Sequence, residues 1–258
     1  MEFEYLLFEK EDGVARITLN RPETRNALNL EIRGELLALF RALSDDDSVK
    51  VLLLTGAGKA FCAGGDIRTM EGVSPVGGRI RLKTGQRLIK AMVELEKPIL
   101  AVVNGVAAGA GVSLALASDM IIASRDARFY FSQVNIAIIP DWGQFYFLPL
   151  RVGVARAKEL MFTGGPLDAL EAERIGLVNR AVPSEELSQE ADALAKRLAK
   201  GPSQSYAMIK AALNRWPTSL EALMEMESTM QAVAFASEDF QEGRKAFLEK
   251  RKPLFQGK

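Results

Sequence analysis

Residues 98–111 read PILAVVNGVAAGAG, an apolar strand pattern that runs into a glycine-bearing turn and the start of a helix. A second segment of this kind, AFCAGGD at 60–66, follows the apolar run VLLLT at 51–55. Both segments can present bare backbone N–H groups, and two such donors aimed at one point would form an oxyanion hole. Taken singly, each segment has an equally good alternative, because its glycines could serve only close helix–strand packing or a tight turn.

Apolar runs of strand length alternate with longer helical patterns from the N-terminus to about residue 183. This alternation is typical of an α/β layer with a buried, largely parallel sheet. We expect strands at 14–19, 51–55, 98–103 and 120–123, helices at 30–44, 79–95 and 109–118, and an irregular stretch from 127. After Pro183 the pattern becomes helical, over 184–199, 204–215, 219–236 and 238–250. The sequence predicts a sheet-based core over 1–183 and a helical region over 184–258.

The composition excludes several kinds of chemistry. The chain of 258 residues has 33 basic and 33 acidic residues, so no overall charge draws it to nucleic acid or to an anionic membrane. Histidine is absent, which excludes a Ser-His or Cys-His nucleophile and a histidine-ligated zinc. The lone Cys62 cannot form an internal disulfide. No secretion signal and no membrane-spanning run is recognisable, so we expect a cytoplasmic protein.

A set of motifs in a fixed order resembles the enoyl-CoA hydratase/isomerase family, the crotonases, over essentially the whole chain. The set includes NRP at 20–22, NALN at 26–29, the 60–66 segment, NG at 104–105, IPD at 139–141, TG at 163–164 and FLEKRKP at 247–253. The resemblance implies a crotonase-like spiral of ββα units and a helical C-terminal trimerisation region over 184–258. It also implies an acyl-CoA substrate, no cofactor or metal, and a homotrimer or a dimer of trimers. By resemblance the oxyanion-hole donors are the N–H groups of Gly65 and Ala110.

The residues that would move protons differ from those of the family's hydratases. Those enzymes hold water with two glutamates, and the matching positions here are Ser113 and Gln133, neither of which takes a proton near neutral pH. A carboxylate reappears at Asp141, where the resemblance places the acid/base aspartate of the isomerases, including those of the phenylacetate pathway. Its apolar sequence neighbours predict a raised pKa. As an alternative, Asp141 caps a helix that begins near Trp142.

These observations predict an enoyl-CoA isomerase that shifts a double bond, from 3-enoyl to 2-enoyl or in a ring-containing acyl group, through an enolate. A hydratase or lyase that uses Asp141 in an altered mechanism is the main alternative. A silent acyl-CoA binder is another. An RNA binder would use the basic helix face at 79, 83, 87 and 90, although such a stripe is more typical of a solvated surface. We expect no nucleic-acid partner and no membrane partner.

The resemblance also implies residues that contact the substrate. Trp142, Ser113 and Gln133 would line the acyl pocket. Residues expected at the CoA moiety are Arg25, Ala27, Ala63, Asp66 and Ile67, with Phe247 and Lys250 reaching in from a neighbouring subunit. Asp66 is expected to be a structural or backbone contact rather than a base. For each cation, an ordinary surface role competes with phosphate binding.

Overall fold

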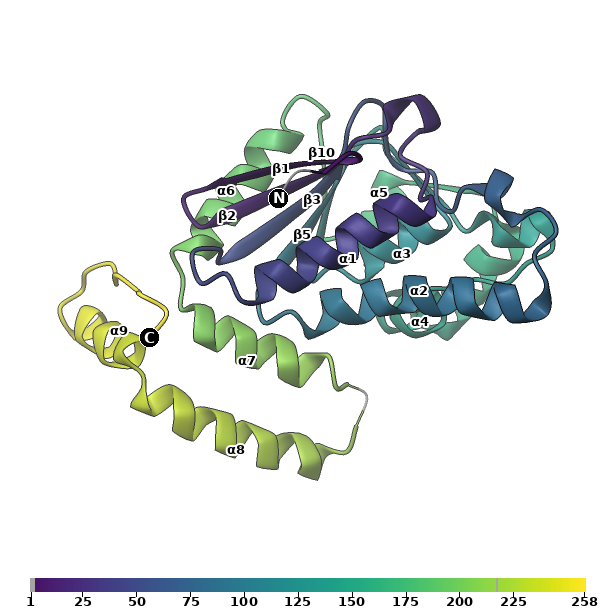
Figure 1. The fold of residues 1–258 in the computed structure, drawn as a ribbon. Coiled ribbons are helices and arrows are strands. Elements are labelled where there is room, and N and C mark those ends of the chain that lie inside the picture. Colours follow the sequence, from purple (N-terminus) through teal and green to yellow (C-terminus); the bar gives the residue numbers. More distant parts are fainter. Residues whose placement is uncertain (1–2, 217) are drawn as a thin grey trace.

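A six-stranded sheet runs through the centre of the protein. The computed structural model describes residues 3–216 and 218–258, and Figure 1 shows the fold. The strand order is β1-β2-β3-β5-β7-β10. β1 pairs antiparallel with β2, and the later pairs are parallel. The strands are β1 (Leu6–Glu11), β2 (Val14–Leu19), β3 (Val51–Gly56), β5 (Ile99–Val103), β7 (Met120–Ser124) and β10 (Arg180–Val182).

A second sheet is built from short strands in the order β4-β6-β8-β9. These strands are β4 (Ala60–Cys62), β6 (Val106–Ala108), β8 (Arg128–Tyr130) and β9 (Pro166–Asp168). β4, β6 and β8 each follow a strand of the first sheet directly, and a helix comes next along the chain. Three repeats of strand, strand and helix therefore wind between the two sheets. This confirms the expected spiral of ββα units.

Helices cover both faces of the first sheet. On β3, Leu52 and Leu54 pack into the large core with α1 (Leu30–Ser44), whereas Val51 and Leu53 pack with α6 (Leu187–Ala199) on the other face. This alternation follows from the two-residue period of a strand. The remaining helices of the spiral are α2 (Pro75–Glu94), α3 (Ala110–Leu116), α4 (Gln144–Thr163) and α5 (Ala169–Arg174), with 3-10 helices η1 (Pro22–Thr24), η2 (Ile67–Met70) and η3 (Ser132–Ile136).

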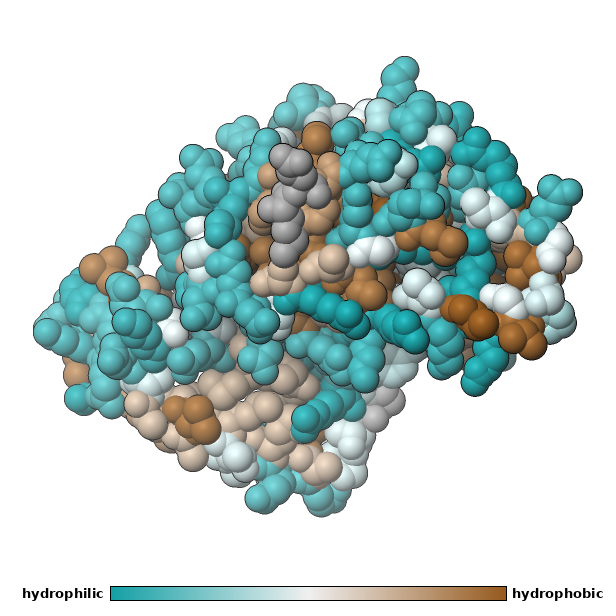
Figure 2. Space-filling view, viewed as in Figure 1, coloured by the Kyte–Doolittle hydropathy of each residue, from teal (hydrophilic) through white to brown (hydrophobic). Residues whose placement is uncertain are grey.

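The chain ends in three helices, α7 (Ser203–Leu213), α8 (Leu220–Ala236) and α9 (Glu238–Leu248). α7 packs against the spiral, where Lys210 donates to the Met92 and Lys97 carbonyls, whereas α8 and α9 lie farther out in Figure 1. No described residue of α8 is buried. Figure 2 shows apolar side chains gathered over this helix, and the exposed ones include Leu220, Met224, Val233 and Phe235. None of the described helices is both long enough and apolar enough to cross a bilayer.

The expected strands and helices are confirmed, with shifts at their ends. α2 begins at Pro75 rather than at residue 79, because the Ser74 hydroxyl accepts the Gly77 N–H at 3.1 Å and proline suits a first helical position. β1 was not predicted from the sequence. The strands of the second sheet were not predicted either, because three residues carry too little periodicity. The stretch from 127, expected to be irregular, contains β8 and η3.

Candidate active site

Gly65 lies where the chain leaves β4, opposite Leu28. The Leu28 N–H donates to the Gly64 carbonyl at 2.7 Å, and the Leu28 carbonyl accepts from the Asp66 N–H at 3.3 Å. This isolated parallel bridge uses the peptide groups on either side of Gly65 and leaves the Gly65 N–H pointing away from Leu28. Within residues 3–216 and 218–258, that N–H donates no hydrogen bond.

Ala110 supplies a second free N–H close by. As the first residue of α3 it has no acceptor inside the helix, and none elsewhere in the described chain. A Cβ on Gly64 would lie 3.4 Å from the Ala110 nitrogen and 2.6 Å from the Ala108 carbonyl oxygen. Only glycine at position 64, where φ is 94°, lets the two segments approach this closely. Two bare N–H groups brought together in this way can bind a carbonyl or enolate oxygen.

Asp141 lies in the loop between η3 and α4. Its carbonyl oxygen accepts from the Gln144 N–H at 3.1 Å and from the Ser113 hydroxyl at 3.2 Å. Burial raises the pKa of the half-buried Asp141 carboxyl above its ordinary value of 3.8, as its apolar neighbours predict. The nearby Gln133 amide and two guanidinium groups oppose the rise in pKa. The N-cap of α4 is Gly143, without a side-chain cap, so the interpretation of Asp141 as a helix cap is wrong.

The uncharged polar side chains beside Asp141 are amides and a hydroxyl. Ser113 is fully buried, and its hydroxyl donates to the Asp141 carbonyl and accepts from Gln144 Nε2 at 2.9 Å. Gln144 Nε2 also donates to the Gly109 carbonyl at 2.8 Å, which ties the Asp141 loop to the turn before Ala110. Sequence reasoning did not identify Gln144, because a bond between residues 35 apart leaves no local pattern.

Gln133 lies beside the same turn, with its amide near the Asp141 carboxyl. It is 5% exposed, and neither amide atom forms a hydrogen bond of normal geometry with the part of the chain that the structure describes. A Cβ on Gly109 would lie 3.8 Å from Gln133 Nε2. An unpaired buried amide is costly, by about 1–3 kcal/mol for each group. Gln133 is therefore available to a substrate atom or to water.

Trp142 occupies a tight slot next to Asp141. It is 2% exposed and has a φ of 49°, a left-handed conformation that is rare for a bulky residue and costs about 1–3 kcal/mol. Gly85 of α2 makes room for the indole, since a Cβ at that position would lie 1.9 Å from the ring. Packing of the indole therefore holds the backbone that carries Asp141.

Arg33 covers another side of the indole and was not identified from the sequence. Its Cζ lies 4.9 Å from the centre of the Trp142 ring, and its side chain is buried. One feature of the sequence could have identified Arg33: it lies on α1 among Ile32, Leu36 and Phe40, which are also buried. A charged residue within the apolar stripe of an amphipathic helix is unusual and points to a special contact.

The expected CoA residues fall into two groups. Arg25, Ala27, Ala63, Asp66 and Ile67 lie together near Gly65, where the Arg25 carbonyl accepts the Ala63 N–H at 2.9 Å and the Arg25 side chain is exposed. Asp66 pairs with Arg68 at 2.8 Å, which lowers the pKa of its carboxyl, as suits a structural residue. Phe247 and Lys250 are exposed on and just after α9, at the opposite end of the molecule in Figure 1. Their contact with CoA from a neighbouring subunit stays a prediction.

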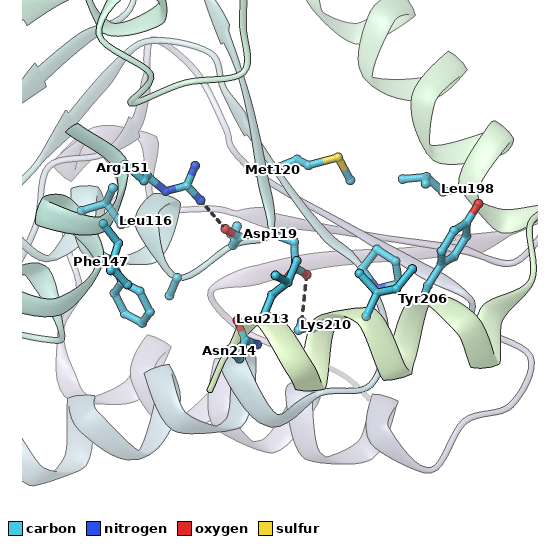
Figure 3. A pocket seen from close by; sticks show the side chains of 15 residues that line it. Leu116, Asp119, Met120, Phe147, Arg151, Leu198, Tyr206, Lys210, Leu213 and Asn214 are labelled. Carbon is cyan, nitrogen blue, oxygen red and sulfur yellow. Dashed lines mark hydrogen bonds and ion pairs between the residues drawn. The ribbon is translucent and has the colours of Figure 1, made fainter. Parts of the chain in front are cut away.

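A separate cavity of about 310 Å³ lies between α7 and the Leu116–Met120 segment that links α3 to β7 (Figure 3). In it Lys210 pairs with Asp119 at 2.8 Å, and Arg151 donates to the Ser118 carbonyl at 2.8 Å. Its lining does not include the free N–H groups or Asp141. We therefore place the candidate active site at the Gly65, Ala110 and Asp141 cluster and not in this cavity.

Comparison with known proteins agrees with this geometry. The sequence model of the enoyl-CoA hydratase/isomerase family matches residues 9–258. The chain belongs to this family. It is 39% identical to the 1,2-epoxyphenylacetyl-CoA isomerase of Escherichia coli K12 and 38% identical to the crotonyl-CoA hydratase of Syntrophomonas wolfei, each match covering 99% of both chains. A crystal structure of an enoyl-CoA hydratase/isomerase from Cupriavidus metallidurans CH34 superposes with a TM-score of 0.94 at 36% identity, over 100% of this chain and 98% of that one. The protein is thus an acyl-CoA enzyme with the crotonase fold.

Proposed function

We propose that this crotonase-family enzyme is an enoyl-CoA isomerase that uses a single carboxyl group to move a double bond. The observation that carries the proposal is Asp141, a half-buried carboxyl with a raised pKa, tied through Gln144 to the turn that bears the Ala110 N–H. Among the described acidic side chains with a resolved shift, Asp141 has its pKa raised, whereas the others have theirs lowered. A raised pKa suits a group that both takes and returns a proton.

The mechanism needs one base and one oxyanion site. The N–H groups of Gly65 and Ala110 bind the thioester oxygen and stabilise negative charge on it, which acidifies the protons at C2. The Asp141 carboxylate takes a proton from C2 of a 3-enoyl thioester, and a dienolate forms. The protonated Asp141 then returns the proton to C4, which leaves the double bond between C2 and C3. Removal of one oxyanion-hole donor typically costs about 3 kcal/mol of transition-state stabilisation.

The neighbouring polar groups favour this one-base chemistry over ordinary hydration. Syn hydration needs a group that activates water, and the family's glutamate positions hold Ser113 and Gln133 here. The Ser113 hydroxyl is already committed to Asp141 and Gln144, so it is not free to hold a reacting water. Asp66 is paired with Arg68, and the lowered pKa of Asp66 makes it a poor base.

A hydratase remains a second candidate, on two specific observations. Relatives named as hydratases match as well as the isomerase does, at 38% and 40% identity. The free amide of Gln133 could hold a water molecule next to Asp141. In that case Asp141 would deprotonate this water instead of the acyl chain. The two candidates therefore share a base and differ in what it deprotonates.

Product analysis separates them. We would incubate the wild type and Asp141→Asn with 3-hexenoyl-CoA and, separately, with 2-butenoyl-CoA. Isomerisation of the first substrate, lost in the variant and without hydration of the second, would support the proposal. Hydration of 2-butenoyl-CoA by the wild type would show that the hydratase, and not the isomerase, is the correct function. An unchanged rate in Asp141→Asn would remove Asp141 from either mechanism.

The assembly and the CoA contacts extend the proposal. The exposed apolar side chains of α8 support a role for the C-terminal helices in a homotrimer or a dimer of trimers. In such an assembly Phe247 and Lys250 could reach the CoA of a neighbouring site. We propose no cofactor beyond the acyl-CoA substrate, since proton transfer by a carboxyl group needs none. Sedimentation of the purified protein tests the assembly.

A further inference from the structure

Arg33 is a buried cation without a carboxylate partner among the residues that the structure describes. Its side chain is 3% exposed, and no acidic oxygen lies within 4.0 Å of its guanidinium in residues 3–216 and 218–258. Arginine is rarely buried in this way unless it is paired. Its Nε is buried and has no hydrogen-bond partner among the described residues. Something other than an ordinary ion pair must account for this position.

One end of the guanidinium contacts the backbone beside the Gly65 donor. Nη2 donates to the Leu28 carbonyl at 2.9 Å, the same carbonyl that accepts from the Asp66 N–H. Nη2 also lies 3.4 Å from the point that a Cβ on Gly65 would occupy. Arg33 thus bonds to one side of the bridge that orients the Gly65 N–H and lies close to the other side.

The face of the guanidinium lies over the Trp142 indole. The distance of 4.9 Å to the ring centre is within the range of a cation–π contact. Gly85 lies against the same indole, so Arg33 and Gly85 together confine it. Since Trp142 follows Asp141 directly and has a left-handed backbone, fixing the indole fixes the direction of the Asp141 loop.

We infer that Arg33 is a positioning residue of the active site, which joins the Gly65 donor to the Asp141 base through Leu28 and Trp142. The charge of Arg33 also favours the carboxylate form of Asp141. Only the expected effect of Arg33 on proton transfer by Asp141 rests on the proposed function. The charged and polar groups that face Asp141 are Arg33 from α1, Arg81 from α2 and Gln133 from η3. Arg33 itself also faces Arg81, Cys62 and Asp66. Burial and the nearby Arg81 lower the pKa of Arg33 to about 10, so it stays charged at neutral pH.

The test compares Arg33→Met with Arg33→Lys, and with Arg41→Met as the matched control. Arg41 lies on the same helix and is exposed. We expect Arg33→Met to lower kcat at least tenfold, with less than a threefold change in KM. The acid limb of its kcat/KM profile should move to higher pH, because a positive charge near the carboxyl is lost. Arg33→Lys should restore the acid limb but not all of kcat, since an ammonium keeps the charge and cannot reproduce the planar contact. Arg41→Met should behave as the wild type.

A second measurement does not depend on activity, so it tests the positioning role whether or not the protein is an isomerase. Replacement of Trp216 by Phe leaves Trp142 as the only tryptophan. In that background Arg33→Met should increase acrylamide quenching of the Trp142 emission at least twofold, and Arg41→Met should not change it. Increased quenching in an enzyme without isomerase activity would refute the proposed function and retain the positioning role. Unchanged quenching together with an unchanged acid limb in Arg33→Met would overturn the inference. If Arg33→Met does not fold, Arg33→Lys decides it, and wild-type values of both kcat and quenching in that variant would overturn the inference.

Discussion

The space for the Trp142 indole depends on the absence of a side chain at Gly85. An added Cβ would lie 1.9 Å from Cε2 and 2.1 Å from Nε1 of the indole, far inside van der Waals contact. The ring is rigid and 2% exposed, so it cannot swing away at low cost. Gly85→Ala must therefore displace the indole, the helix or both.

The expected change in the free energy of unfolding of Gly85→Ala follows from two opposing effects. Alanine in the interior of a helix gains about 0.5–1 kcal/mol over glycine, whereas overpacking of a dense core costs about 1–3 kcal/mol. We expect a net loss of about 1–2 kcal/mol in the free energy of unfolding. At about 2–4 °C per kcal/mol for a chain of this size, Tm should fall by roughly 2–8 °C. Because the displaced residue adjoins Asp141, kcat should fall by about tenfold or more.

Gly34 provides the matched control. It lies in the interior of α1, is exposed, and a Cβ there would meet no atom within 4 Å. Gly34→Ala should raise Tm by about 1–4 °C and leave kcat unchanged. Thermal unfolding followed by circular dichroism, with steady-state kinetics, measures both variants. A second variant, Trp142→Leu, should abolish the cost of Gly85→Ala, because the clash with the ring is gone. Equal Tm shifts for Gly85→Ala and Gly34→Ala would refute the reasoning.

The further predictions concern three titratable groups, Asp141, Lys210 and Cys62. The acid limb of kcat/KM for the free enzyme should have its midpoint above the ordinary aspartate value of 3.8, because burial raises the pKa of Asp141 and the base must be ionised to act. The raised pKa also means that the folded protein loses stability as the pH rises from the ordinary aspartate value to the pKa of folded Asp141, because Asp141 ionises less readily in the folded protein. Asp141→Asn should remove this loss, as measured by chemical denaturation at a series of pH values. Lys210→Met should destabilise the protein by about 3 kcal/mol, since it leaves the partly buried Asp119 carboxylate without its cation, and the double variant Lys210→Met/Asp119→Asn should cost less. Cys62 should resist a thiol reagent in the native protein and react once in denaturant, because burial raises the pKa of its thiol to about 12.

The architecture could be predicted from the sequence wherever an element is long enough to show its period. Val14–Leu19 and Leu30–Ser44 form the predicted strand and helix with the same bounds. The strands of the second sheet have three residues each, and their partners are up to 46 positions away, as with Ala60 and Val106. No local pattern encodes such pairs, so the second sheet followed only from the family resemblance.

The site was predictable to a similar degree. Glycine turns after apolar strands indicated where free N–H groups would lie, and the apolar neighbours of Asp141 indicated the direction of its pKa shift. The supporting contacts were not predictable. Arg33, Gly85 and Gln144 contact the Asp141 loop from three different helices, at sequence separations set by the fold. Their roles depend on side-chain packing that periodicity does not specify.

The central claim is that one carboxyl group, Asp141, carries a proton from C2 to C4 of the acyl chain. The most direct measurement is the conversion of 3-hexenoyl-CoA labelled with deuterium at C2, in ordinary water, with the product analysed by mass and by NMR. The account predicts that part of the wild-type product carries deuterium at C4, and that Asp141→Asn forms the product at least a hundredfold more slowly. Product formation by Asp141→Asn at the wild-type rate, or a hydrated product in place of the 2-enoyl thioester, would contradict it.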